Sequence, residues 1–236
     1  MENLDLYSKV EHLLGIEEST IYLHTLYIEV LYNYEIKTLL DIGCGTGDLM
    51  QKFQEYGIAC DGIDLSALMV EKARAKGLNA EYKDICEVDK KYDAIVSVFD
   101  VLNFVTPDEL EGFLNCVHAA LNDEGIFVFD VNTLHGFANV AEGTMTEEEG
   151  DMFLAVDAEF KDNILNTKFT LFTKETSQAS FEKNEEGTYT KEQSTITQYF
   201  HSLQIFKKLK NFKVVQSAYL DMYDEKDKAL IVLKKA

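Results

Sequence analysis

Leu39-Leu40-Asp41-Ile42-Gly43-Cys44-Gly45-Thr46-Gly47-Asp48-Leu49, residues 39–49, is the stretch that decides the fold of this chain. It combines an apolar strand, an acid two residues before the first glycine, a GxGxG turn and the start of an amphipathic helix. Glycine permits positive φ angles and lets the backbone approach a ligand closely. The stretch therefore predicts a strand, turn and helix that hold a nucleoside cofactor at the turn.

The sequence around this turn alternates between short apolar runs and helical periods from residue 37 to about 131, which is typical of βαβ units on a parallel sheet. Helices are expected after the glycine turn, from a Ser66 cap to Gly77, and from the capping box Thr106-Pro107-Asp108-Glu109. The predicted fold class is α/β, a doubly wound, mostly parallel seven-stranded sheet of the Rossmann-like kind. The expected core strands are 37–42, 58–64, 80–83, 92–98 and 125–131.

Beyond the fifth strand the hydrophobic pattern changes to a period of two residues. This pattern predicts an antiparallel β insertion with turns at 162–163 and 184–187. A helix over 202–210 and closing strands over 212–219 and 229–234 are expected to follow. Two helices, 4–14 and 21–34 with Thr20 as a cap, precede the core. We expect a single domain, 1–236, made of N-terminal helices (1–34), a cofactor-binding core (35–133), an antiparallel cover (about 134–200) and a last helix with closing strands (201–236).

Composition restricts the function further. The net charge of −20 disfavours nucleic acid and anionic membranes as partners, and no apolar run reaches the ~18 to 20 residues that a membrane span needs. The four cysteines are far apart, so we expect reduced, mostly buried thiols and no metal site. The acidic run Glu147–Glu149 with Asp151 is interpreted as a solvated loop. A cytoplasmic protein is expected.

Three acids follow three successive predicted strands: Asp41, Asp64 and Asp84. The carboxyl ends of neighbouring parallel strands share one crevice, so these acids are expected to line one ligand site. An acid beside the glycine turn suits a ligand with an ammonium group better than a dinucleotide pyrophosphate. The dinucleotide pattern GxGxxG would also need glycine at position 48, where Asp48 stands.

These motifs resemble those of the class I S-adenosylmethionine-dependent methyltransferases. The resemblance covers most of residues 37–131 and rests on Leu40-Asp41-Ile42-Gly43-Cys44-Gly45-Thr46-Gly47, Gly62-Ile63-Asp64-Leu65-Ser66 and Tyr92-Asp93-Ala94-Ile95-Val96. Residues 98–104 and 129–133, followed by hairpins, resemble a bacterial subgroup of small-molecule type. The implied cofactor is S-adenosylmethionine, with S-adenosylhomocysteine as the product and no metal.

The resemblance also implies roles for individual residues. The backbone from Gly43 to Gly45 would pack on the methionine part of the cofactor, Asp41 would hold its ammonium, and Asp64 would accept the ribose hydroxyls. The other implied contacts are with adenine (Leu65, Met69, Asp84, Ile85), with the methyl donor (Phe99, Asp100) and, from an N-terminal helix over the cofactor, with Tyr7. Core packing is the favoured alternative for Met69, and a turn explains Asp84 equally well. Cys44 has no visible partner base, so it is not interpreted as a nucleophile.

The acceptor side of the site is less well marked. Asp100-Val101-Leu102-Asn103 stands where an Asn-Pro-Pro-Tyr type motif would indicate nucleobase or glutamine amide methylation, so the expected acceptor is an amine or a hydroxyl of a small molecule. Methyl transfer from a sulfonium is an in-line displacement, and an enzyme base is optional for a neutral amine. The candidate acceptor contacts follow predicted strands or the insertion: Asn103, His135, Tyr199 and His201. A lone histidine is more often a structural residue than a base.

Two other functions stay open at this point. A protein that binds S-adenosylmethionine or S-adenosylhomocysteine without turnover would carry the same motifs, since fold does not establish activity. A nicotinamide-dependent oxidoreductase is disfavoured by Asp41 and by the missing last glycine. A monomer or a homodimer is expected.

Overall fold

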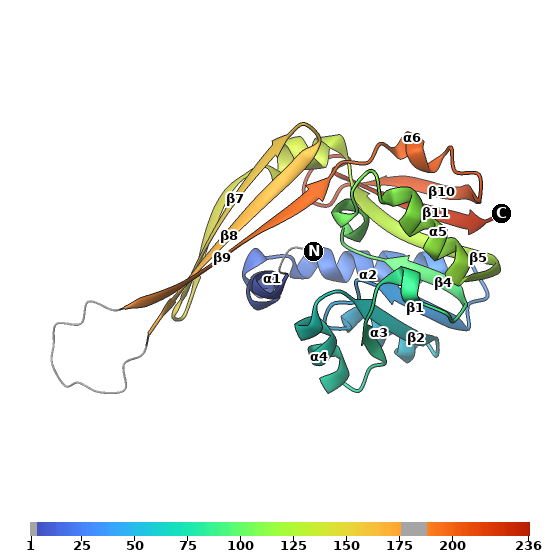
Figure 1. The fold of residues 1–236 in the computed structure, drawn as a ribbon, viewed down its shortest axis with the longest axis horizontal. Coiled ribbons are helices and arrows are strands. Elements are labelled where there is room, and N and C mark those ends of the chain that lie inside the picture. The colour runs from blue at the N-terminus through green and yellow to red at the C-terminus, as the bar shows by residue number, and fades with distance from the viewer. Residues whose placement is uncertain (1–3, 176–187) are drawn as a thin grey trace.

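The structure, a computed structural model, describes residues 4–175 and 188–236. A seven-stranded sheet with helices on both faces forms the core, and a four-stranded antiparallel sheet projects from it as a long arm (Figure 1). The predicted turn at 184–187 lies outside the described residues.

The core sheet has the strand order β10-β11-β5-β4-β1-β2-β3. Strands β1 to β5 pair in parallel, and β11 pairs antiparallel with both β5 and β10. The predicted fold class, a mostly parallel seven-stranded Rossmann-like sheet, is thereby confirmed. Its strands are β1 (Thr38–Ile42), β2 (Ala59–Asp64), β3 (Ala80–Tyr82), β4 (Tyr92–Ser97), β5 (Leu121–Asn132), β10 (Phe212–Leu220) and β11 (Lys228–Lys235).

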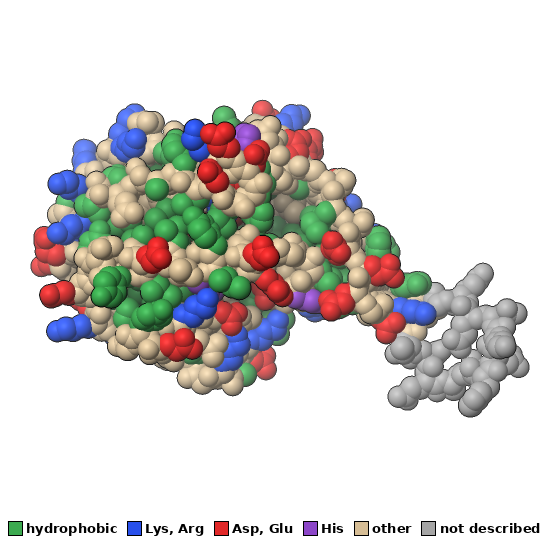
Figure 2. All heavy atoms as spheres, turned by 180° about the vertical axis from the view of Figure 1, so that it is seen from behind, with side chains coloured by type: hydrophobic (Ala, Val, Ile, Leu, Met, Phe, Trp, Pro, Cys, Tyr) green, Lys and Arg blue, Asp and Glu red, His purple; other side chains and the backbone are tan. Residues whose placement is uncertain are grey.

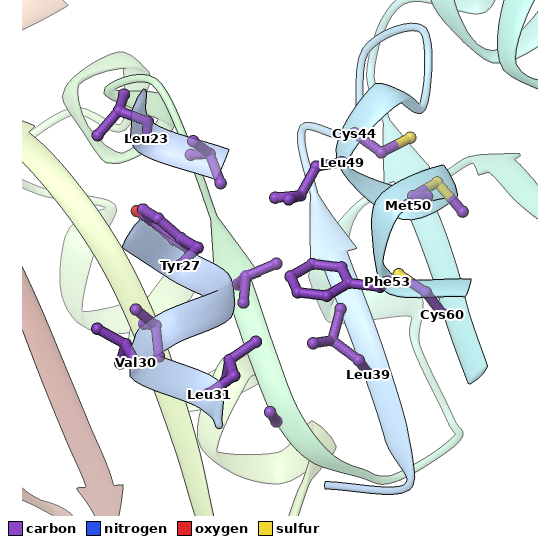
Figure 3. Packing of buried hydrophobic residues seen from close by; sticks show 14 of the residues in the cluster. Leu23, Tyr27, Val30, Leu31, Leu39, Cys44, Leu49, Met50, Phe53 and Cys60 are labelled. Atoms are coloured by element: carbon purple, nitrogen blue, oxygen red, sulfur yellow. The ribbon is translucent and has the colours of Figure 1, made fainter. Parts of the chain in front are cut away.

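Two hydrophobic layers cover the two faces of this sheet, because successive strand residues point to opposite sides. Leu39 belongs to the layer with α2 (Glu17–Leu31), α3 (Asp48–Glu55) and α4 (Ala67–Ala75), whereas Leu40 belongs to the layer with α5 (Leu110–Ala120) and α6 (Leu203–Phe206). Figure 3 shows the first layer, with α2 and α3 facing each other. Its labelled members are Leu23, Tyr27, Val30, Leu31, Leu39, Cys44, Leu49, Met50, Phe53 and Cys60.

The arm is the antiparallel insertion predicted after the fifth strand. Its strands pair in sequence order as β6 (Gly143–Glu149), β7 (Met152–Lys161), β8 (Ile164–Lys174) and β9 (Tyr189–Tyr199). The β7–β8 turn has Asp162 and Asn163 at φ 52° and 66°, which suits a tight hairpin. The N-terminal helix α1 (Asp5–Val10) and the turn η1 (Glu11–Leu14) pack their apolar side chains against this sheet rather than against the core.

Several predicted elements differ from the structure in extent or kind. Thr20 is not a cap: it lies inside α2, and its hydroxyl donates a hydrogen bond to the carbonyl of Ile16 at 2.8 Å. The helix predicted at 202–210 is only α6, capped by Ser202. The acidic run Glu147–Glu149 is not a loop, because it forms the exposed edge strand β6, and it turns into β7 at Gly150.

The cysteine prediction was wrong for two of the four residues. Cys86 and Cys116 form a disulfide between η2 (Ile85–Glu87) and α5. Their sequence separation of 30 residues gave no hint of this pairing, which comes from α5 passing beside η2. Cys44 and Cys60 are buried free thiols, as expected.

Within residues 4–175 and 188–236, no helix is both long and apolar enough to cross a membrane.

Candidate functional site

The glycine turn joins β1 to α3 with the backbone geometry that only glycine adopts readily. Gly43, Gly45 and Gly47 have φ angles of 72°, 54° and 81°. A Cβ atom on Gly43 would lie 2.6 Å from Cγ2 of Val101, so the turn touches the segment after β4. A Cβ on Gly45 would meet no atom within 4 Å, so the turn opens on to free space there. This opening is where a ligand can approach bare backbone.

Asp41 lies at the end of β1, beside this opening, and is only 3% exposed. No hydrogen bond reaches its carboxylate from the described part of the chain. Burial, and then the nearby charge of Asp64, raise its pKa to about 8. A buried carboxylate without a partner is costly, so this position favours a ligand that brings a positive charge.

Asp64 ends β2 and faces the same turn. Its carboxylate accepts hydrogen bonds from the backbone N–H of Gly45 at 2.9 Å and of Ser66 at 2.8 Å. Each oxygen therefore has accepting capacity left, although burial raises the pKa of the group. Asp64 holds the glycine turn against the start of α4, where Leu65 is half-buried and Met69 is buried.

Asp84 follows β3 and caps η2, with Oδ1 accepting from the N–H of Cys86 at 2.8 Å and Glu87 bonding back to the N–H of Asp84. The turn that the sequence offers as an alternative explanation of Asp84 is therefore present. Ile85 next to it is buried. The disulfide between Cys86 and Cys116 joins this turn to α5.

The segment after β4 contains two consecutive left-handed residues, Phe99 (φ 61°) and Asp100 (φ 62°). Non-glycine residues adopt this conformation only when their surroundings hold them there. Both N–H groups donate to one carboxylate, that of Asp130 on β5, at 2.9 and 3.2 Å. Asp130 is fully buried, and its Oδ1 also lies 2.7 Å from the hydroxyl of Tyr27 on α2. The hydroxyl of Tyr27 points away from Phe53 in Figure 3.

Lys228, at the start of β11, is a buried cation in the same cluster. Its side chain is 4% exposed, and its Nζ contacts the carboxylate of Asp100 and lies 3.5 Å from Asp130 and 3.1 Å from Oδ1 of Asn132. Asn132 in turn donates to Oδ2 of Asp100 at 2.9 Å. Burial lowers the pKa of Lys228 and raises the pKa of Asp130. We call Tyr27, Asp100, Asp130, Asn132 and Lys228 the lysine cluster.

Two of the predicted acceptor contacts, Asn103 and His201, are buried and hydrogen-bond to loops, although Nδ1 of His201 has no partner among the described residues. Asn103 in η3 (Val101–Phe104) donates to the carbonyl of Tyr199 at 2.8 Å and accepts from the N–H of Asn132 at 3.0 Å. Nε2 of His201 lies 2.9 Å from the carbonyl oxygen of Val105 and 3.0 Å from that of Leu102. Because both neighbours are acceptors, Nε2 carries the proton. Burial lowers the pKa of His201. Both side chains tie the end of β9 to η3.

His135, the third candidate, is partly exposed after β5, and its Nε2 lies 2.9 Å from the carboxylate of Asp224. Tyr199, the fourth, ends β9 and is half-buried. Tyr7 on α1 packs edge-on against Phe169 of β8, with ring centroids 5.8 Å apart. A cavity of about 470 Å³ lies beside α1, between α4 and β9, and no residue predicted to bind the cofactor lines it.

Comparison with known proteins agrees with this geometry. Residues 39–125 match the family model described as a methyltransferase domain. The whole chain superposes on a crystal structure of an S-adenosylmethionine-dependent methyltransferase from Clostridium acetobutylicum ATCC 824, with a TM-score of 0.78, 19% identity and coverage of 98% of this chain and 99% of that one. Residues 39–125 are thus similar to a methyltransferase domain, and the chain as a whole has the fold of that S-adenosylmethionine-dependent methyltransferase.

Two further comparisons are informative for this chain. It is 31% identical to the putative methyltransferase YqeM of Bacillus subtilis (strain 168) over 124 residues, which cover 48% of this chain and 50% of YqeM. The match thus spans about half the length of that curated relative. The S-adenosylmethionine-bound structure of CalS10, an amino pentose methyltransferase of Micromonospora echinaspora, has a TM-score of 0.71 with 16% identity and covers 98% of this chain and 97% of CalS10.

The residues around the glycine turn fit an S-adenosylmethionine cofactor. The fit rests on the open space at Gly45 and on the unpartnered carboxylate of Asp41, which suits an ammonium. Sequence reasoning missed Tyr27, Asp130 and Lys228. A signal for one of them existed, because Asp130 interrupts the apolar run 126–131, whereas Lys228 stands among charged residues that look solvated.

Proposed function

We propose that this protein is a methyltransferase that moves a methyl group from S-adenosylmethionine to an amine or a hydroxyl of a small molecule. The observation that carries the proposal is the buried, unpartnered carboxylate of Asp41 beside the open glycine turn. A cofactor with an ammonium group would occupy the open space and pair with Asp41. A dinucleotide pyrophosphate would bring further negative charge to a site that already holds Asp41 and Asp64.

The cofactor, when bound, supplies a methyl group on a positively charged sulfur that leaves as a neutral thioether. The chain's part is then to bind, orient and exclude water. The backbone from Gly43 to Gly45 and the carboxylates of Asp41 and Asp64 would hold the cofactor, and Asp84 with Ile85 would lie toward adenine. Positioning of this kind can supply about 7–11 kcal/mol of a reaction barrier.

The acceptor would lie between the core and the arm. Asn103 and His201 support the proposal, because they fix the end of β9 to η3 and so connect the arm to the segment that follows β4. Tyr199 and His135 are the proposed contacts with the acceptor itself. CalS10, with the same fold, is an amino pentose methyltransferase, which agrees with a small-molecule acceptor. In this proposal residues 1–236 act as one domain, as a monomer or a homodimer.

Thermal unfolding with S-adenosylmethionine, S-adenosylhomocysteine and NAD in parallel tests the cofactor. A ligand at 100 times its Kd stabilises the folded state by ~2.7 kcal/mol, so a raised Tm with either adenosyl ligand and none with NAD is expected. A panel of amines and hydroxylated metabolites, assayed for S-adenosylhomocysteine release, then tests turnover. Binding without any methylated product across the panel would favour the binding protein over the enzyme.

A further inference from the structure

The lysine cluster is an unusual group of buried charges at the carboxyl-terminal edge of the core sheet. Lysine is almost never buried unless it is paired, and here one lysine faces two carboxylates. The cluster joins the segments after β4 and β5 to the start of β11 and to α2. It therefore gathers side chains that are distant in the sequence at one point of the sheet.

This point adjoins the glycine turn. Val101, the residue after Asp100, fills the space that a Cβ on Gly43 would need. Asp100 is thus one residue from a direct contact with the proposed cofactor site. Its side chain is 16% exposed, whereas that of Asp130 is 0% and that of Lys228 is 4% exposed. Among the charged members of the cluster, Asp100 has the most exposed side chain.

The cluster also maintains the strained conformation that presents Asp100. Asp130 holds the left-handed backbone of Phe99 and Asp100, and Lys228 with Asn132 engages the two carboxylate oxygens of Asp100. Strain of this kind collects at functional sites, where the surroundings determine one geometry. With both aspartates ionised, the cluster carries a net negative charge whether Lys228 is protonated or not, and an ammonium would offset it.

We propose that Asp100 binds a cationic nitrogen acceptor and takes its proton, and that Lys228 is a positioning residue that receives this proton from Asp100. The proposal rests on the proposed function and deepens it. The N–H bond of the acceptor ammonium breaks, the proton passes through the Asp100 carboxylate to the uncharged Nζ of Lys228, and the nitrogen lone pair becomes free to attack the methyl group. The proton leaves to solvent after the product departs.

Titratable and charged groups surround Lys228 on several elements: Asp100 after β4, Asp130 on β5, Tyr27 on α2 and the adjacent Asp227. The carboxylate of Asp227 is already held by the N–H groups of Met222 and Tyr223. Asp41 on β1 acts on the pKa of Tyr27. Because burial lowers the pKa of Lys228, this amine can exchange a proton near neutral pH, which an arginine could not do.

A binding experiment tests Asp100 without knowledge of the acceptor. Sinefungin carries an amine in place of the methyl-bearing sulfonium of S-adenosylmethionine, so its affinity relative to S-adenosylhomocysteine reports a negative group at the reacting position. Isothermal titration of both ligands with Asp100→Asn should show a loss of roughly tenfold or more for sinefungin and little change for S-adenosylhomocysteine. Asp61→Asn is the matched control, since Asp61 pairs with Lys90 on the surface away from the crevice.

The proposed role of Lys228 is tested by a measurement that a purely structural role would not affect. In the wild type, the ratio of the affinities for sinefungin and S-adenosylhomocysteine should change with pH around neutrality. This pH dependence, the pH step, should vanish in both Lys228→Met and Lys228→Arg. Lys228→Arg retains the positive charge, so it should keep the fold and bind S-adenosylhomocysteine. A Lys228→Arg protein that keeps the pH step would overturn the role of Lys228, and equal losses of both ligands in Asp100→Asn would overturn that of Asp100. If the wild type binds neither ligand, the proposed function fails first.

Discussion

Asp41 carries the most direct prediction at the scale of a residue. In the free protein its pKa of about 8 keeps it protonated at pH 7, and an ammonium ligand would favour the carboxylate. Binding of S-adenosylhomocysteine should therefore release protons at pH 7, and the affinity should rise as the pH approaches 8. Titration calorimetry in buffers of different ionisation enthalpy measures this release.

The same shift affects the stability of the unliganded protein. The pKa of Asp41 is higher in the folded protein than in the unfolded chain. The contribution of Asp41 to the free energy of unfolding is therefore fully present below pH 3.8, its ordinary pKa, and is lost as the pH rises to about 8. Asp41→Asn should remove both the proton release and this pH dependence, and weaken binding by about 10- to 100-fold. Unchanged proton release in the variant would show that another group titrates.

Strand β5 gives a prediction at the scale of an element. Phe127 is fully buried between α5 and β11 and stacks on Phe129 with ring centroids 4.7 Å apart. Phe127→Ala should lower the free energy of unfolding by about 3–5 kcal/mol, because it leaves a cavity in the centre of the sheet. Phe153→Ala is the control in the arm, where the ring is 38% exposed and the loss should be much smaller. Urea unfolding compares the two.

The disulfide is a second feature at this scale. It closes a loop of 30 residues between η2 and α5, which corresponds to about 3–4 kcal/mol in the chain-entropy model. The double variant Cys86→Ser with Cys116→Ser should unfold at a lower temperature than the wild type without reductant. Dithiothreitol should lower the Tm of the wild type to that of the variant. A wild-type Tm that does not change with dithiothreitol would contradict the disulfide between Cys86 and Cys116.

The elements differ in how far the sequence predicted them. The glycine turn and strands β1 to β5 were predictable because each has its own apolar run and turn signal, and Ser66 does cap α4 through the N–H of Met69. Strand β6 was missed because an exposed edge strand needs no apolar alternation. The lysine cluster was missed for a physical reason: its members become neighbours only when β11 pairs with β5. Pairing of distant strands leaves no local trace in the sequence.

The arm gives a prediction for the whole molecule. It carries α1 on its inner face, and Lys72 of α4 bonds the carbonyl of Ser8 at 2.8 Å, so the arm, α1 and the core form a continuous surface. Deleting residues 152–190 should abolish turnover of any acceptor found and affect S-adenosylhomocysteine binding less, since the glycine turn is in the core. Calorimetry and product release measure the two effects. Equal loss of both would count against the arm as an acceptor cover.

The charge of the whole molecule is consistent with a cationic acceptor. Figure 2 shows acidic side chains on the core and at the base of the arm on the visible face. At a net charge of −20 the protein attracts cations over a distance that salt shortens to about 8 Å at physiological ionic strength. This field concentrates positively charged molecules near the crevice before any contact forms.

The packing of α1 on the arm also has a consequence for synthesis of the protein on the ribosome. Leu6, Val10 and Leu13 emerge early, but their partners on β7, β8 and β9, such as Leu154 and Ile196, are made more than a hundred residues later. The apolar side of α1 therefore lacks its packing partners while strands β1 to β5 of the core are translated. A nascent chain of this protein is thus expected to need shielding over α1 for as long as the strands of the arm are not yet made.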